Sequence, residues 1–404
     1  MSTSLLYHGF GIRGYRYVNT KYKGGDILFT IRQGPLELCC PVCGSRGIIR
    51  RGQIKRRFRS LPIGKKRVWI SLYIQRVFCL ICHALRQVKI GFADKRRTYT
   101  KSFERYALDL SRHMTIRDVA NHLQVSWDII KDIQKRNLQK RYKRPKLKKL
   151  KQIAIDEISI GKGHRYLTIV LDLKTGRVVF VAEGKGSEAL EPFWKRLKRA
   201  KADIKAVAMD MSPAYITAVI QNMKKAAIVF DHFHVIKLYN EKLSDFRRKL
   251  YREATTALEK RVLKGTRWLL LKNPDNLDET RNEPQRLKEA IELNQPLAIA
   301  YYMKEDLRQL WSQKDKASAK TFLHDWITRA KSSKIPMLMK FAQTLIAHQS
   351  GILSYYDYPI STAPLEGTNN KIKTMKRQAY GFRDMEFFKL KIMAIHETKY
   401  ALVG

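Results

Sequence analysis

The stretch Ile153-Ala154-Ile155-Asp156-Glu157-Ile158-Ser159-Ile160 places an acidic pair inside an apolar run that is rich in β-branched residues. Such residues favour strands, and the apolar side chains on both sides of the pair indicate a strand that is largely buried. A buried carboxylate is costly unless a cation or a metal ion compensates it. Two interpretations of Asp156 follow: an exposed residue near a strand end, or the first metal ligand of a phosphoryl-transfer site.

The residues after this stretch predict a mixed sheet with helices around it. Residues 153–182 hold three apolar runs separated by glycine-containing turns, which is typical of a three-strand meander. Two further runs, 206–209 and 227–230, end at Asp210 and Asp231 and lead into helical patterns. An antiparallel meander followed by β-α units indicates a mixed sheet with helical cover. Taken singly, each aspartate is as well explained as a turn or helix-capping residue as by metal binding.

From about residue 240 to 350 the pattern becomes helical and heavily charged. We therefore expect an all-helical insertion between the sheet and a final helix. Aromatic residues at such spacings belong more often to the core than to a functional site. The tryptophans expected to be buried in this way are Trp268, Trp311 and Trp326.

The final helix is expected to begin within residues 361–373, where polar capping candidates and an early proline mark a helix start. Spacings of i, i+4, i+7 and i+11 place four of its residues on one face: Glu366, Asn370, Lys373 and Arg377. A carboxylate with cations two to three turns further along fits a metal site beside a phosphate track. The alternative is a first-turn glutamate that only interacts with the helix dipole.

The charge balance predicts a polyanionic partner. The 404 residues include 80 Lys+Arg and 36 Asp+Glu, a net charge of +44, and this excess points most simply to a nucleic-acid backbone. No apolar run approaches the roughly 18–20 residues that span a bilayer, and the first residues lack the features of a signal peptide. We therefore expect no membrane partner and a cytoplasmic location.

The cysteines predict a structural zinc site. All five lie between residues 39 and 82, and four of them form two Cys-x-x-Cys pairs, Cys40 with Cys43 and Cys79 with Cys82. Two such pairs make a tetrahedral thiolate set if the chain between them folds back. Cys39 is left over and His83 could replace one ligand, so the exact set stays open. Nine Lys and Arg residues without an acid at 50–67 favour phosphate contact by this module.

A helix-turn-helix is predicted at residues 115–133. The apolar spacing gives a short amphipathic helix, a break at Gln124-Val125 and a second helix capped by Ser126, at roughly 127–138. That second helix would enter a major groove, whereas the alternative is an ordinary helical hairpin. Ten Lys and Arg residues without an acid follow from 135 to 151, as in a linker along a phosphate backbone. The residues expected to contact DNA are Arg117, Ser126, Trp127, Lys131, Lys135, Arg136, Lys140 and Arg141, together with Lys373 and Arg377 on the final helix.

These motifs together resemble the transposases of bacterial insertion sequences in the ISL3 family, a branch of the DDE transposases. The likeness covers nearly the whole chain and takes in many separate motifs in order. They are Cys40-Pro41-Val42-Cys43-Gly44, the helix-turn-helix at 115–133, Ile155-Asp156-Glu157, Met209-Asp210-Met211-Ser212, Asp231-His232-Phe233-His234, Leu269-Leu270-Leu271-Lys272-Asn273 and the run 361–371.

The resemblance implies a multidomain α/β protein whose ribonuclease-H-like mixed-sheet core is interrupted by a helical insertion. We expect a zinc-ribbon-like module at 1–93, a helix-turn-helix domain with a basic linker at 94–151, and the catalytic core at 152–404, with its insertion at about 240–350. The implied catalytic triad is Asp156, Asp210 and Glu366, which would bind Mg²⁺ or Mn²⁺, as two ions. Supporting or DNA-facing roles are expected for Asp231, His232 and His234, and structural roles for Glu157 and Asp172.

The function that follows is that of a DNA transposase. We expect it to bind the terminal inverted repeats of its element and to catalyse metal-dependent DNA strand cleavage and strand transfer. Its partners would be double-stranded transposon ends and target DNA. It would act as a homo-oligomer, at least a dimer on DNA, near the bacterial nucleoid. Two alternatives are a catalytically inactive, transposase-derived DNA-binding regulator and a nuclease without joining activity.

Overall fold

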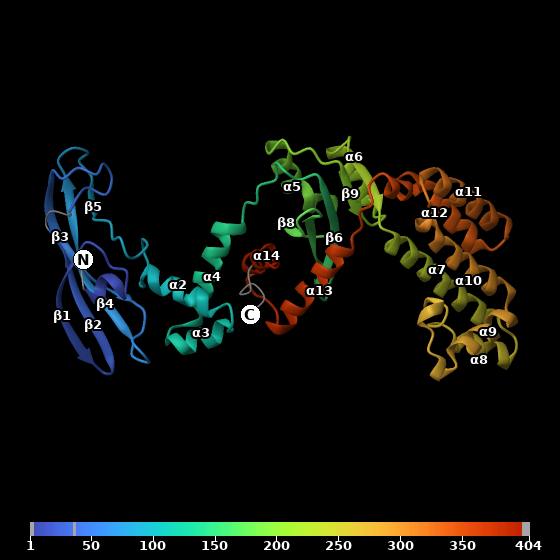
Figure 1. Ribbon diagram of the computed structural model, residues 1–404, viewed down its shortest axis with the longest axis horizontal. Coiled ribbons are helices and arrows are strands. Elements are labelled where there is room, and N and C mark those ends of the chain that lie inside the picture. The colour runs from blue at the N-terminus through green and yellow to red at the C-terminus, as the bar shows by residue number, and fades with distance from the viewer. Residues whose placement is uncertain (1–3, 35–37, 398–404) are drawn as a thin grey trace. The chain divides into compact units, whose positions relative to one another are not determined.

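The computed structural model describes residues 4–34 and 38–397, which form two compact units. The first unit contains residues 1–144 and 374–404, and the second contains residues 145–373. Figure 1 shows the elements of both. Helix α13 (Ala363–Gln378) belongs to both units, because the boundary at 373/374 falls inside it.

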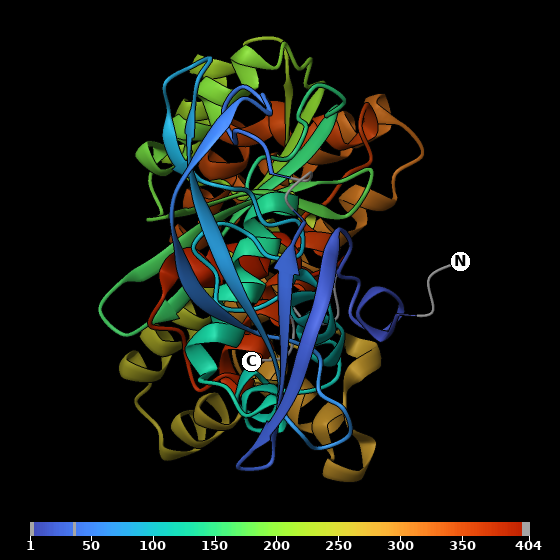
Figure 2. The ribbon, with the colours of Figure 1, turned by 90° about the vertical axis from the view of Figure 1, so that its left-hand side faces the viewer.

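The first unit begins with a mixed five-stranded sheet. After the short helix α1 (Leu5–His8) come β1 (Tyr15–Lys23), β2 (Asp26–Gln33), β3 (Ile48–Arg59), β4 (Val68–Cys79) and β5 (Leu85–Gln87). The order is β1-β2-β4-β3, with β5 also paired to β4. Only β2 and β4 run parallel, and the long strands face the viewer in Figure 2. Along β4 apolar side chains alternate with others, and Val68, Ile70, Leu72 and Ile74 are all buried.

Three helices follow in the first unit: α2 (Lys101–Leu110), α3 (Ile116–Leu123) and α4 (Trp127–Tyr142). A capping box between Thr115 and Asp118 begins α3, and Gln124 ends it in the left-handed region with φ +52°. The predicted break therefore lies where expected, although α4 continues four residues beyond the predicted end. Ser126 occupies the N-cap position of α4, but its side chain makes no capping hydrogen bond.

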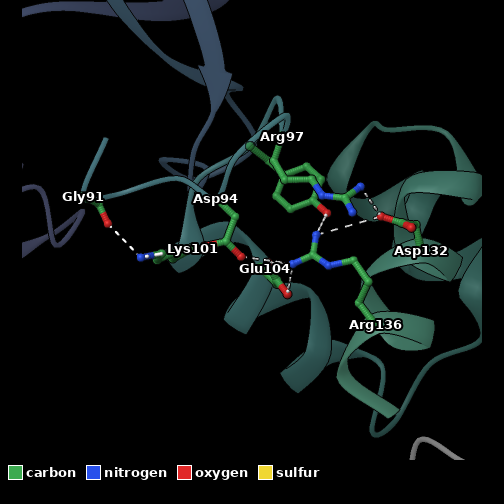
Figure 3. A network of polar contacts seen from close by, with 8 residues as sticks. Gly91, Asp94, Arg97, Lys101, Glu104, Asp132 and Arg136 are labelled. Atoms are coloured by element: carbon green, nitrogen blue, oxygen red, sulfur yellow. Dashed lines mark hydrogen bonds and ion pairs between the residues drawn. The ribbon is translucent and has the colours of Figure 1, made fainter. Parts of the chain in front are cut away.

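Buried and half-buried arginines join the sheet to these helices. Arg59 is 4 % exposed and donates to the carbonyl oxygens of Val68, in the sheet, and Leu123, at the end of α3. This position overturns the expectation that Arg59 is one of the phosphate-facing cations at 50–67. The neighbouring network in Figure 3 holds the segment before α2 against α4, with Arg97 on Asp132 at 2.7 Å.

The second unit is built on the predicted mixed sheet. Its strands are β6 (Gln152–Gly161), β7 (Arg165–Asp172), β8 (Arg177–Glu183), β9 (Ala206–Met209) and β10 (Ala227–Phe230), in the order β10-β9-β6-β7-β8. β6, β7 and β8 form the antiparallel meander, whereas β9 and β10 continue the sheet in parallel with β6. The strand predictions at 153–182, 206–209 and 227–230 are confirmed.

The alternation of side chains along β6 separates two faces of this sheet. Ile153 and Ile155 point to one face and pack with helices α5 (Ser187–Arg199) and α6 (Pro213–Asn222), for example against Phe193 and Tyr215. Asp156, the next residue along the strand, points to the opposite face. There its carboxylate meets helix α13, which Figure 1 shows beside β6.

Helices α7 (His232–Glu253) to α12 (Pro336–Leu353) form the helical segment between β10 and α13. The elements between are α8 (Ala257–Gly265), α9 (Glu283–Leu293), α10 (Gln295–Arg308) and α11 (Lys316–Ser332), with short 3₁₀ turns. Trp326 is fully buried and Trp311 half-buried, but Trp268 is 65 % exposed. Its burial was therefore wrongly predicted: it stacks with the neighbouring Arg267 guanidinium at 4.6 Å from its ring.

A last helix, α14 (Met385–Met393), packs against α4 in the first unit. Phe387, Leu390 and Ala394 meet Leu138 and Tyr142 of α4 in one apolar cluster. Within the described residues, no helix has the length and apolar character needed to span a membrane.

Candidate functional site

Four cysteines meet at one end of the N-terminal sheet. The β3–β4 hairpin places Ile48 opposite Cys79, so the Cys-x-x-Cys pair before β3 lies beside the pair after β4. The Sγ atoms of all four lie within 4.8 Å of one another, with 3.6 Å between Cys40 and Cys82 and 3.4 Å between Cys43 and Cys79. Tetrahedral Zn–S bonds of about 2.3 Å place sulfurs about 3.8 Å apart, so this set fits zinc.

The surroundings act in opposite directions on two thiols of the cluster. Hydrogen bonds from the backbone N–H groups of Cys43 and Val42 lower the pKa of Cys40 to about 6, whereas the neighbouring Cys79 thiol and burial raise the pKa of Cys43 to about 12. Four crowded thiols cannot all ionise without a cation to offset their repulsion. Among the described residues that could bind a metal, neither Cys39 nor His83 joins this cluster, so Cys40, Cys43, Cys79 and Cys82 form the candidate ligand set.

Asp156 and Asp210 are neighbours on adjoining parallel strands. β6 and β9 pair with Ala154 opposite Ala208. Continuing this register by two residues brings Asp156 beside Asp210, which directly follows β9. Neighbouring strands lie about 4.8 Å apart. The Asp210 carboxylate is oriented by the backbone N–H of Ser212, which donates to Oδ1 at 3.0 Å.

The surroundings of Asp156 hold its carboxyl close to a second negative charge. Burial raises the pKa of Asp156 above its ordinary value, and the Asp210 carboxylate raises it further. The backbone N–H of Glu157, which donates at 2.8 Å, and the nearby His234 act in the opposite direction. Two carboxylates placed together at the end of a sheet, at a cost in free energy, form a candidate cation site.

Helix α13 carries the third predicted carboxylate. Its Asn369 is buried and donates from Nδ2 to Oδ2 of Asp156 at 2.8 Å. Glu366 lies one helical turn earlier and is exposed. The oxygens of Glu366, Asp156 and Asp210 do not converge within 4.8 Å, since among the described residues the cysteine thiols alone form so close a group. The structure thus pairs the two aspartates and places Glu366 one turn from the residue that contacts Asp156.

Asp231 fixes the beginning of α13. It is 2 % exposed and caps α7 by accepting from the backbone N–H of Phe233 at 2.8 Å. Its Oδ2 also accepts from the backbone N–H of Thr362 at 2.6 Å and from the Thr362 hydroxyl. The carbonyl of Thr362 in turn accepts from the N–H of Glu366 at 2.9 Å. Asp231 is therefore buried rather than DNA-facing, and it connects the end of β10 to the first turn of α13.

The two histidines after Asp231 differ in position. His234 lies close enough to Asp156 for its charge to lower the pKa of that carboxyl. His232 packs its ring against Trp311, with ring centroids 5.8 Å apart, and its Nδ1 lies 3.5 Å from Asp231. His234 thus belongs to the surroundings of the two aspartates, whereas His232 lies at the junction with the helical segment.

Glu157 and Asp172 hold the sheet in shape. Glu157 points to the α6 face, where Tyr215 hydrogen-bonds to it, and burial followed by the charges of Asp210 and Asp156 raises its pKa. Asp172 ends β7 and accepts from the Lys174 N–H at 3.1 Å, which closes the turn to β8. Both contacts agree with the structural roles expected for these residues.

The predicted DNA-contacting residues fall into three groups. Seven are exposed, as a surface role requires: Arg117, Ser126, Trp127, Lys140, Arg141, Lys373 and Arg377. Lys131 is half-buried and lies 3.7 Å from Asp384 and 4.0 Å from Asp128. Lys135 instead pairs with Asp384 at 3.0 Å and Glu386 at 2.9 Å, and its hydrogen bond is the largest cause that lowers the pKa of Glu386 to about 2. Arg136 donates to Glu104 at 2.9 Å and to the Tyr99 hydroxyl at 2.8 Å (Figure 3). Lys135 and Arg136 therefore form ion pairs within the first unit.

Sequence reasoning missed two residues of the carboxylate site. It placed Asn370 with Glu366 at i, i+4, whereas Asn369 at i+3 makes the contact with Asp156 and Asn370 is exposed. Both spacings share a helix face, so the doubled asparagine was the available signal. Thr362 gave no signal beyond its place as a capping candidate before α13.

Comparison with known proteins finds the same kind of protein along nearly the whole chain. Residues 153–392 match a family described as transposase, and residues 88–136 match the helix-turn-helix domain of transposase family ISL3. The chain is 34 % identical over 393 residues to the transposase for insertion sequence element IS1001 of Bordetella parapertussis, covering 96 % of this chain and 95 % of that protein.

More distant relatives are the transposases for insertion sequence element IS1557 of two Mycobacterium tuberculosis strains, CDC 1551 / Oshkosh and H37Rv. Each is 29 % identical over 371 residues, which is 85 % of this chain and 82 % of that protein. Among solved structures, the Drosophila P element transposase strand transfer complex matches with a TM-score of 0.42 and 12 % identity, covering 76 % of this chain and 94 % of that one.

Proposed function

This chain belongs to the ISL3 family of transposases, and from that membership we propose that it binds the terminal inverted repeats of an insertion sequence and catalyses metal-dependent DNA strand cleavage and strand transfer. The observation that carries the catalytic part is the pairing of Asp156 with Asp210, with Asn369 holding α13 against the first of them. A phosphoryl-transfer site needs such carboxylates at one fixed place.

The candidate metal ligands in this proposal are Asp156, Asp210 and Glu366. Their carboxylates are hard oxygen donors of the kind that Mg²⁺ and Mn²⁺ prefer, and a bound cation would offset the burial and the Asp210 charge that raise the pKa of Asp156. Two divalent ions bound there would supply charge stabilisation and activation of water or a 3′-hydroxyl. The protein contributes orientation: Ser212 directs Asp210, and Asn369 directs Asp156.

We propose a ribonuclease-H-like core for residues 152–404, with the helices near 240–350 as an insertion. The support is the strand order β10-β9-β6-β7-β8, in which an antiparallel meander is extended by two parallel strands. Both aspartates then lie where the central strand meets its parallel neighbour. The parts before it, in this proposal, are a zinc-binding module at 1–93 and a helix-turn-helix domain with a basic linker at 94–151.

The four-cysteine cluster is proposed to hold one structural zinc ion, because the number and spacing of its thiol ligands fit that metal. The ion would join the chain before β3 to the chain after β4. The exposed cations of β3, including Arg50, Lys55 and Arg57, would then lie on a rigid hairpin available to phosphates. We propose that this module and the helix-turn-helix together bind the element ends, and that at least two copies act on two ends.

Strand transfer on DNA that carries one end of the element tests the proposal. We expect Asp156→Asn, Asp210→Asn and Glu366→Gln each to abolish cleavage and joining in Mg²⁺ while end-DNA affinity stays at the wild-type level. Full activity in any of the three variants removes that residue from the assignment. Cleavage without joining by the wild type would identify a nuclease, and binding with neither reaction would identify a regulator.

Asn369→Ala tests the contact between Asn369 and Asp156, and Asn370→Ala, at the exposed neighbouring position, is its control. Because Asn369 orients Asp156, its loss should reduce activity by roughly 10- to 100-fold, as for other groups that orient a metal ligand. The Asn370 variant should retain most of the activity. Equal effects of the two changes would contradict the role given to Asn369.

A further inference from the structure

A concave surface joins the helix-turn-helix to the turn that follows α13. Its cavity of ≈ 840 Å³ is lined from α3 and α4 by Thr115, Arg117, Trp127 and Lys131, and from the turn by Tyr380 and Arg383 among others. All of these residues belong to the first unit. We call these six residues the composite surface. It lies at the N-terminal ends of α3 and α4, which is the end of a helix-turn-helix that approaches DNA.

The turn at 379–383 is fixed to this place. It closes α13 through hydrogen bonds from the N–H of Gly381 to the Lys376 carbonyl at 3.0 Å and from the N–H of Tyr380 to the Arg377 carbonyl at 3.1 Å. Phe382 then stacks on Phe388 of α14 with ring centroids 4.5 Å apart. A turn held at both ends presents its side chains in a defined position.

Ion pairs connect the start of α14 to α4. Asp384 caps α14 by accepting from the Phe387 N–H at 3.0 Å, and it pairs with Lys135 at 3.0 Å and Lys131 at 3.7 Å. The same aspartate thus fixes the end of the turn against α4. Sequence reasoning had no means to connect Asp384 with α4, because Asp384 and Lys135 are 249 positions apart.

Tyr380 is fully exposed and has an unfavourable backbone conformation. Its φ is +51°, in the left-handed region that residues other than glycine, asparagine and aspartate rarely adopt, and its side chain is 100 % exposed. A tyrosine there buries no apolar area and gains no packing, so folding alone does not explain it. Strained positions of this kind gather at binding sites.

The chemistry of the composite surface suits a phosphate backbone. Arg117, Lys131 and Arg383 supply cations, and Lys131 lies 5.2 Å from the centroid of the half-exposed Trp127 ring. The acid that lines the cavity, Asp384, is paired with Lys131 and Lys135, while Asp128 approaches Lys131 at 4.0 Å from outside the lining. A polyanion meets a surface whose cations outnumber its carboxylates.

We propose that the turn at 379–383 is part of the DNA-binding surface, so that duplex DNA is held by three elements rather than two. The N-terminal end of α4, with Trp127 and Lys131, lies in the major groove. Tyr380 and Arg383 donate hydrogen bonds to phosphates of the backbone that borders that groove. This inference rests on the proposed function, because it takes DNA as the ligand, and it assigns the turn a positioning role, since phosphate contacts carry no direct sequence information.

Binding of full-length protein to end DNA and to a scrambled duplex, measured over a range of salt concentrations, tests the inference. Arg383→Gln should weaken binding to both duplexes by the same factor, roughly three- to tenfold. It should lower the slope of log K against log salt by about one. Lys225→Gln, which removes one exposed cation from the loop between α6 and β10, is the control for net charge and should leave the slope unchanged.

Tyr380→Gly separates binding from folding. Glycine adopts φ +51° without strain, so the variant should melt at the wild-type temperature or slightly above it. Its DNA affinity should still fall, and Tyr380→Phe should account for the hydroxyl part of the loss. The inference would be overturned if Arg383→Gln and Tyr380→Gly kept the wild-type DNA affinity and the wild-type slope of log K against log salt. It would also be overturned if these variants changed the oligomeric state but not DNA binding, because the turn would then be an interface between copies. A wild-type protein that binds end DNA no better than scrambled DNA would instead overturn the proposed function.

Discussion

Removing the carboxylate of Asp231 should loosen α13 and reduce catalysis without removing a metal ligand. The side chain accepts from three donors: the N–H of Phe233 at 2.8 Å, the N–H of Thr362 at 2.6 Å and the Thr362 hydroxyl. Each buried donor left without a partner costs about 1–3 kcal/mol. The Phe233 end lies near solvent, since that side chain is 48 % exposed, so we expect Asp231→Ala to cost about 3–5 kcal/mol in total.

Thr362→Val provides the second arm of a double-mutant cycle. Valine keeps the shape and the backbone N–H of Thr362 but lacks the hydroxyl, so this change should cost about 1–2 kcal/mol. In the Asp231→Ala background the hydroxyl has already lost its acceptor, and the same change should cost almost nothing more. The two substitutions should therefore be non-additive by about 1–2 kcal/mol.

Hydrogen exchange measured by mass spectrometry is the appropriate assay, because a protein of two units need not unfold in one step. Peptides that cover residues 231–240 and 361–370 report the opening free energy on the two sides of the contact. Asp315→Ala is the matched control: Asp315 caps α11 through the Ser318 N–H at 2.8 Å, and its loss should cost only about 1 kcal/mol.

Additive effects within about 0.5 kcal/mol would refute a direct coupling between Asp231 and Thr362. So would protection lost at 231–240 but retained at 361–370, since α13 would then be held by something else. Strand cleavage should fall in parallel with protection at 361–370. The DNA affinity of Asp231→Ala should stay at the wild-type level, because the helix-turn-helix and the turn at 379–383 belong to the other unit, where α14 and α4 hold the turn in place.

Three further predictions concern other parts of the chain. In Gly351→Ala the new Cβ would lie 2.4 Å from Phe230 Cε2, so the variant should be destabilised by about 1–3 kcal/mol and melt at a lower temperature. Gly367→Ala, which has open space at its Cβ, should not lower the melting temperature. Cys43→Ser should lower the zinc content measured by elemental analysis from about one ion per chain towards zero, and Cys39→Ser should leave it unchanged. Burial lowers the pKa of Lys391 to about 7, so between pH 7 and 9 the unfolded chain holds a proton on this amine that the folded chain lacks. Thermal stability should therefore rise with pH over this interval, and Lys391→Met should reduce the rise. An equal rise in the variant and the wild type would contradict a buried neutral amine.

The elements that could be predicted from the sequence are those with strong local patterns. The apolar runs of the second sheet and the capping residues around α3 depend on neighbours within a few positions, so their spacing alone indicates them. The aspartates at 156 and 210 belong to the same class. Each lies in or directly after a strand, and parallel pairing of the two strands then brings them together.

What could not be predicted depends on partners far along the chain. Lys135 looks from the sequence like a DNA contact, but its acids at 384 and 386 are about 250 residues away. Asn369 and Asn370 differ by one position, and only the rotation of α13 against the sheet decides which of them meets Asp156. Trp268 was expected in the core because aromatic residues usually are, yet a neighbouring arginine gives its ring a surface position.

The two contacts that hold α13 also explain how Glu366 can be exposed and still be positioned. Thr362, four residues before it, is bound by Asp231, and Asn369, three residues after it, is bound to Asp156. The span from 362 to 369 rises only about 10 Å in a helix, so two such contacts leave its backbone little freedom. What remains free is rotation of the Glu366 side chain. The aspartates are therefore positioned by strand pairing and the backbone of Glu366 by helix docking, so in the proposed metal site the element that would have to move on ion binding is the Glu366 side chain.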